Sequence, residues 1–141
     1  MQVKLQKATQ YGLYAVIELA RDPSRQLSAI DIADKYSISS NHLAKVLRDL
    51  GRAGLVDSVR GAGGGYRFSK NSKRVTLMDI INIFESINAA NTLSPEPGDE
   101  TDIGKALLLV RKEIDEITQA TFGSITIDTL LKTMTTGSNI A

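Results

Sequence analysis

The sequence predicts a mainly α-helical fold that carries one small β-hairpin. Apolar residues recur every three or four positions through most of the chain, which is the spacing of one helix face. One stretch alternates instead and is interrupted by the glycine-rich run GAGGG. With 141 residues, 42% hydrophobic and 23% charged, the chain suits one domain or a small domain with an appended segment.

Two helices are predicted before residue 37. The first ends at Asp22-Pro23, because proline disfavours helix in the residue before it. A capping-box pattern, Ser28 with Asp31, starts a short second helix, SAIDIADKY. The apolar positions of the first helix are Tyr11, Leu13, Val16, Ile17 and Ala20.

A third helix follows after the short connection 37–39 and ends near Gly54, a residue suited to the position after a helix C-cap. Its apolar stripe is Leu43, Val46, Leu47 and Leu50. The opposite face, at about 100° per residue, holds Asn41, Lys45, Arg48 and Arg52. Two short helices joined in this way indicate a helix-turn-helix.

The alternating segments Leu55–Arg60 and Tyr66–Ser69 predict a hairpin, whose glycines permit the positive φ values of a turn. A basic-rimmed hairpin directly after a helix-turn-helix is typical of a wing. The fold class is therefore a winged helix-turn-helix.

After the hairpin, a second capping box, Thr76 with Asp79, starts a helix that reaches about Asn88. Residues 1–88 are predicted to form the DNA-binding domain, and residues 89–101 form a loop. Residues 102–134 are predicted to contain two helices: a long dimerisation helix that ends at Phe122-Gly123, and a short helix over 125–134. Residues 135–141 are predicted to form a flexible tail. The dimerisation stripe is Ile103, Leu107, Val110, Ile114 and Ile117, with coiled-coil spacing. The alternative is that this stripe packs on its own domain.

The charge is divided between the two halves. Residues 1–78 contain 13 Lys or Arg and 6 Asp or Glu, a net +7, whereas residues 79–141 contain 4 and 10, a net −6. A basic N-terminal half favours a polyanionic partner. No stretch approaches the roughly 20 apolar residues of a membrane span, and no signal peptide is recognised, so we expect a cytoplasmic protein without a membrane partner.

These features predict binding of double-stranded DNA. The base-reading candidates are Ser39, Ser40, Asn41, His42 and Lys45, because the first turns of a recognition helix reach base edges in the major groove. Arg48 and Arg52 are expected at phosphates, and Arg60 at an adjacent minor groove. The alternatives are a solvated helix face and a winged-helix module that binds an acidic protein surface.

An enzyme is not expected. With one histidine and no cysteine, no nucleophile–base pair is recognisable, and the acidic cluster at residues 96–102 matches no calcium-binding spacing.

The segments TQYGLYAVIELA, GLVDSVRGAGGGYRFS and VTLMDIINIFESI resemble the Rrf-two (Rrf2) family of bacterial winged helix-turn-helix regulators. The resemblance implies a cytoplasmic transcriptional regulator, commonly a repressor, that binds partly palindromic operators as a homodimer. It also implies major-groove roles for Ser39 to His42 and Lys45, and a minor-groove role for Arg60 with the glycine turn, which includes Gly63 and Gly64.

Members of that family that bind an iron–sulfur cluster carry three cysteines before the dimerisation helix, whereas this chain has none. A cysteine-ligated iron–sulfur cluster is therefore impossible, and no cofactor is expected. Control by a small-molecule effector, by a regulatory protein partner or by the protein's own concentration remains open, as does an engineered loss of native cysteines.

Overall fold

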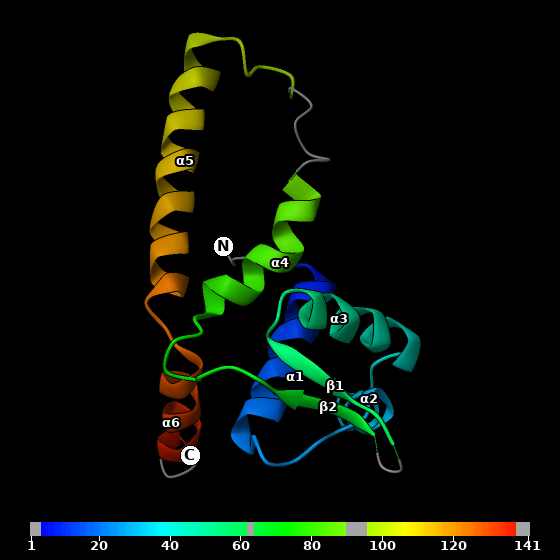
Figure 1. Cartoon of the computed structure of the whole chain (residues 1–141). Helices are drawn as coiled ribbons and strands as arrows, with labels where there is room; N and C mark the ends of the chain where they lie inside the picture. The colour runs from blue at the N-terminus through cyan, green and yellow to red at the C-terminus, as the bar shows by residue number, and fades with distance from the viewer. Residues whose placement is uncertain (1–3, 62–63, 90–95, 138–141) are drawn as a thin grey trace.

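The computed structural model describes residues 4–61, 64–89 and 96–137 and contains mainly helices with one two-stranded antiparallel sheet (Figure 1). The predicted fold class is confirmed. In chain order the elements are α1 (Lys7–Arg21), α2 (Ala29–Tyr36), α3 (Ser40–Arg52), β1 (Val56–Val59), β2 (Gly65–Phe68), α4 (Leu77–Ala89), α5 (Asp102–Gly123) and α6 (Ile127–Gly137).

The helix ends follow local sequence signals. Both predicted capping boxes form: the Ser28 hydroxyl accepts from the Asp31 N–H at 3.1 Å, and the Thr76 hydroxyl accepts from the Asp79 N–H at 3.2 Å. Gly54 follows the C-cap of α3 with φ of 81°, as predicted. Its N–H donates to the Gly51 carbonyl, and the Leu55 N–H donates to the Leu50 carbonyl, which completes a Schellman motif.

The core lies between α1 and the helices that surround it. Ala15, Val16 and Leu19 of α1 are almost fully buried, together with the predicted stripe of α3. On the α4 side, the ring of Phe84 lies against Gly12, where an added Cβ would be 2.5 Å from the ring. A glycine is therefore required for this close approach of α1 and α4.

The wing contains a strand contact that the sequence does not predict. β1 pairs with β2 with Val56 opposite Phe68 and Val59 opposite Gly65. Leu27, just before α2, forms a further antiparallel bridge with Tyr66, through hydrogen bonds of 3.0 and 2.8 Å. The wing is thus attached on its other edge to the segment that starts the helix-turn-helix.

Helix α6 shares the core formed by the elements from α1 to α4. Ile127, the first residue of α6, is fully buried in that core. The Ile127 N–H donates to the Val75 carbonyl at 2.9 Å, and the Leu77 N–H donates to the Ile125 carbonyl at 2.9 Å. These bonds tie the α5–α6 junction to the segment that connects the wing to α4.

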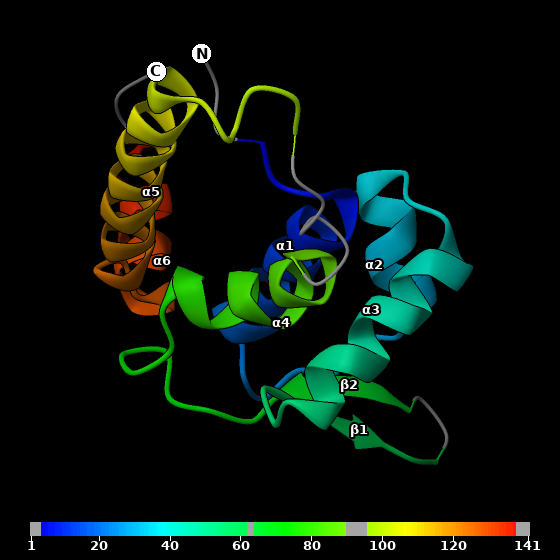
Figure 2. The same ribbon diagram turned by 90° about the horizontal axis from the view of Figure 1, so that it is seen from above.

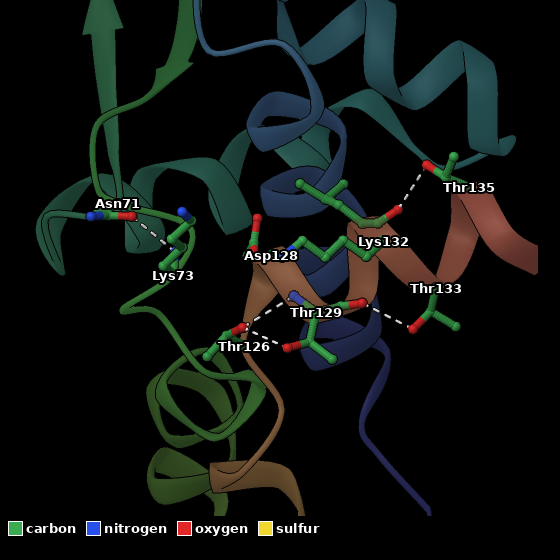
Figure 3. Close-up of polar contacts among 9 residues, drawn as sticks. Asn71, Lys73, Thr126, Asp128, Thr129, Lys132, Thr133 and Thr135 are labelled. Atoms are coloured by element: carbon green, nitrogen blue, oxygen red, sulfur yellow. Dashed lines mark hydrogen bonds and ion pairs between the residues drawn. The ribbon is translucent and has the colours of Figure 1, made fainter.

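Helix α6 differs from its predicted bounds. It begins at Ile127 rather than residue 125, because the Thr126 hydroxyl accepts from the Thr129 N–H at 3.1 Å and caps the helix (Figure 3). It continues to Gly137, so the predicted tail from residue 135 is wrong for its first three residues; residues 138–141 lie outside the described part.

Helix α5 stands away from the rest of the molecule. Its Asp102 end projects beyond the body, whereas its Gly123 end is attached through α6 (Figure 1). Seen from above, α5 and α6 lie on one side, and α2, α3 and the hairpin lie on the other (Figure 2). No residue of α5 is buried.

We expect Ile127→Ala to lower the free energy of unfolding by about 2–5 kcal/mol, because it leaves a cavity in a shared core. The measurement is urea denaturation at one fixed protein concentration. Ile30→Ala is the matched control: the same atoms are removed from a side chain that is 61% exposed, and we expect a change of about 0.5 kcal/mol. Equal losses in the two variants would contradict the placement of Ile127.

Candidate nucleic-acid interface

Helix α3 separates its apolar and cationic residues onto opposite faces. Leu43, Val46, Leu47 and Leu50 are at most 2% exposed. Asn41, Lys45 and Arg48 are exposed, and within the described part of the chain no hydrogen bond or ion pair engages their side chains. Arg52 is also exposed, but its guanidinium lies 3.9 Å from the Asp49 carboxylate. The exposed face therefore offers one amide and two unpaired cations to a polyanion.

The first turn of α3 is organised by the chain itself. The Ser39 hydroxyl accepts from the His42 N–H at 3.4 Å, so Ser39 caps the helix. Ser40 is exposed beside it. The half-buried His42 ring packs edge-on against Tyr11 of α1, with ring centroids 5.0 Å apart. His42 thus joins the recognition helix to α1 in addition to lying next to the exposed face.

The turn between α2 and α3 is held by side chains of α1. Tyr14 stacks on Tyr36, the last residue of α2, with centroids 4.9 Å apart and planes 3° from parallel. The Glu18 carboxylate accepts from Lys35 Nζ and from the Tyr36 hydroxyl, each at 2.6 Å. Ser37, which follows, has φ of 55°, so the chain reverses in the left-handed region before α3 begins.

Burial and hydrogen bonding act in opposite directions on Glu18. Burial raises the pKa of its carboxyl, but the hydrogen bonds from Lys35 and Tyr36, with the charges of Lys35 and Arg21, lower it by more. The pKa of Glu18 therefore lies below its ordinary value. The pKa of Tyr36 is raised, first by burial and then by its hydrogen bond to Glu18, so the hydroxyl stays protonated and donating.

The wing presents a basic residue at the end of its first strand, near a glycine whose position excludes a side chain. Arg60 is exposed and is followed by Gly61 at φ of 112°. A Cβ on Gly64 would lie 2.6 Å from the Val59 carbonyl oxygen, so this position requires glycine. Gly63 lies outside the described residues. Arg60 and Gly64 are thus placed together on the hairpin that follows α3.

The predicted dimerisation stripe is exposed along α5. Ile103, Leu107, Val110, Ile114 and Ile117 are between 50% and 75% exposed. The interpretation that this stripe packs on its own domain is wrong for the isolated chain. Helix α5 instead approaches α4 through Phe122 and its neighbours. Phe122 lies about 100° around the helix from the centre of the stripe.

The fold and the exposed face define a winged helix-turn-helix DNA-binding protein. The Rrf2 family profile, described as "Iron-dependent Transcriptional regulator", matches residues 5–133, and the chain belongs to this family. It is 55% identical over 136 residues to the HTH-type transcriptional regulator BadM of Rhodopseudomonas palustris, covering 96% of this chain and 86% of that protein.

Two further proteins extend the comparison. The chain is 37% identical over 127 residues to the HTH-type transcriptional regulator NsrR of Bacillus licheniformis, covering 82% of this chain and 89% of that one. The structure of CymR, the global cysteine regulator of B. subtilis, matches with a TM-score of 0.72 at 30% identity, covering 93% of this chain and 98% of CymR. The protein is therefore a DNA-binding transcriptional regulator and not an enzyme.

The family's iron dependence does not fit the residues present. Among the described residues, no group of three or more His, Cys, Asp and Glu side chains is placed to hold a metal ion. The remaining residues, 1–3, 62–63, 90–95 and 138–141, contain none of these four types.

No helix in the described ranges has the length and apolarity needed to cross a bilayer.

Several residues that position the interface were not singled out from the sequence. Glu18, Tyr14 and Tyr36 were not recognised, because their partners are far apart along the chain. The spacing of Tyr11, Tyr14 and Glu18 does place them on one face of α1, and that stripe was the available signal. Leu27 gave no signal of a strand contact beyond its apolar character.

We expect Glu18→Gln to lower the free energy of unfolding by about 1–3 kcal/mol at pH 7, because it weakens two hydrogen bonds to a charged acceptor. Because the pKa of Glu18 is lower in the folded state, its charge stabilises the fold at pH values above the ordinary pKa of 4.5. This contribution is lost as the pH falls through the pKa of the folded state. The difference between wild type and variant should therefore shrink below pH 4.5 in denaturation curves.

Glu116→Gln, on the exposed surface of α5, is the control and should leave stability unchanged at both pH values. A pH-independent difference for Glu18→Gln would show that its charge is not what stabilises this contact.

Proposed function

We propose that this regulator is a homodimeric repressor that binds a partly palindromic operator. The observation that carries this is the exposed face of α3, on which Lys45 and Arg48 have no partner among the described residues, beside a wing whose glycine-rich turn follows Arg60. Two recognition helices related by a two-fold axis would address half-sites about 34 Å apart, one turn of DNA. Its place of action is then the cytoplasm, where the bacterial chromosome lies.

Roles follow from position along α3. Ser40, Asn41 and Lys45 lie in the first two turns, where side chains reach base edges. Ser39 serves as the cap and His42 packs against Tyr11, so both position these readers. Arg48 lies a turn further on, in a place suited to phosphate, and Arg60 suits an adjacent minor groove of A·T-rich DNA.

The exposed stripe of α5 supports the homodimer. An apolar row of this length on a projecting helix costs solvation free energy unless a partner covers it. A second copy offers a stripe of the same coiled-coil spacing.

We also propose that the protein works without an iron–sulfur cluster, because the chain has no cysteine. A small-molecule effector or a regulatory protein partner would then supply the signal.

We expect Lys45→Ala and Arg48→Ala to weaken operator binding differently. Loss of a base contact at Lys45 should cost about 1–3 kcal/mol and relax the preference at one base pair, whereas loss of a phosphate contact at Arg48 should reduce the salt slope by about 1. The measurement is a fluorescence titration over a range of salt, using sites selected from a random duplex pool. Lys112→Ala, on α5, is the matched control.

Selection of a two-fold symmetric site supports the operator proposal. Weak, sequence-blind binding by the wild type, or unchanged affinity and salt slope in both variants, would instead favour a winged-helix module that binds an acidic protein surface.

The homodimer is tested with a single introduced thiol. Because the chain has no cysteine, Val110→Cys should form a disulfide-linked dimer under mild oxidation, seen on a non-reducing gel. Lys112→Cys lies two residues away, about 200° around the helix, and should remain largely without a disulfide cross-link on the same gel. Equal cross-linking at both positions, or a monomer by sedimentation, would contradict a dimer that uses the stripe.

A further inference from the structure

A small cavity lies where the dimerisation helix joins the DNA-binding region. Its volume is about 170 Å³, and it is formed by the segment before α1, by α4 and by the last turns of α5. At roughly 30 Å³ per water molecule it has room for a small organic molecule. It is therefore placed where a ligand would touch both functional parts of the chain.

The inner surface of the cavity is apolar. Leu5, Met78, Ile81 and Phe122 line it, and they come from three different segments. Each is partly buried or buried in the folded chain. Such a surface suits the aliphatic or aromatic part of a ligand.

The polar residues at the cavity carry opposite charges. Glu85 is engaged by the protein, because its Oε1 accepts from the Thr9 hydroxyl at 2.6 Å and from the Gln6 N–H at 3.0 Å. Lys4 and Asp115 also line the cavity, and in the described ranges neither makes a hydrogen bond or ion pair with the protein. One cation and one anion are thus available to a ligand beside the apolar surface.

The cavity lies to one side of the proposed dimerisation stripe on α5. Asp115 lies about 120° around α5 from Ile103, and Phe122 lies about 100° from it. The dimerisation stripe and the cavity therefore belong to different faces of the same helix.

We propose that this cavity binds a zwitterion with an apolar side chain, of the amino-acid class. The ligand's ammonium group is placed at Asp115, its carboxylate at Lys4, and its side chain against Phe122 and Met78. A simple acid or a simple amine of the same shape would satisfy only one of the two charges.

Binding here changes how α5 is held against α4, and so changes the spacing of two recognition helices in a dimer. This regulatory consequence rests on the proposed homodimeric operator binding, whereas ligand binding itself does not.

The test uses the full-length protein and thermal unfolding. The probes are L-leucine, L-methionine and L-phenylalanine, with 4-methylpentanoate and 3-methylbutylamine as the singly charged analogues of leucine. At saturation, at least one amino acid should raise Tm by about 5 °C, and the leucine analogues should have less effect than leucine. Asp115→Asn and Lys4→Met should remove the shift. Lys112→Met, elsewhere on α5, should retain it.

The absence of a shift with all three amino acids would overturn the proposal, as would a shift that survives both cavity variants. An acid or amine that binds as well as the amino acid would overturn the zwitterion assignment. Operator titration with and without the bound amino acid is the second readout. Ligand binding without any change in operator affinity would refute the regulatory consequence alone, and failure of all operator binding would refute the proposed function instead.

Discussion

The close packing of Phe84 against Gly12 is the constraint on which the arrangement of the molecule depends. Because a Cβ at position 12 would overlap the ring, α1 and α4 can approach only with glycine there. One side of α1 then positions the helix-turn-helix through Tyr11, Tyr14 and Glu18. α4, on the other side, meets the last turns of α5. Helices α3 and α5 are thus both located relative to this one contact.

Much of the fold could be predicted, because the signals are local. Helical spacing of apolar residues, two capping boxes and Gly54 gave the elements from α1 to α4 within a few residues. The bridge between Leu27 and Tyr66 and the burial of Ile127 could not be predicted, since both join segments about 40 residues or more apart. The start of α6 was missed because Thr126, a weaker cap signal, was not used.

The candidate nucleic-acid interface likewise contains features that local sequence signals predict and others that depend on distant contacts. The exposed face of α3 follows from its periodicity alone, so Asn41, Lys45 and Arg48 could be predicted as exposed. The orientation of His42 could not, because it depends on Tyr11, a residue 31 positions earlier in the chain. A side chain that looks available for DNA in the sequence is thus partly used to hold the recognition helix in place. Contacts between helices decide which polar residues remain free.

The burial of Ile127 makes the chain less modular than its linear order suggests. Helix α5 lies between the wing and α6 in sequence, yet α6 contributes a residue to the core that supports the wing. Cleavage anywhere in α5 would therefore release a core residue and leave a fragment that reads DNA poorly, rather than an autonomous monomeric binder. The architecture limits recombination: α5 and α6 can be replaced by another segment only if that segment carries its own equivalent of Ile127 and the backbone pairing beside it.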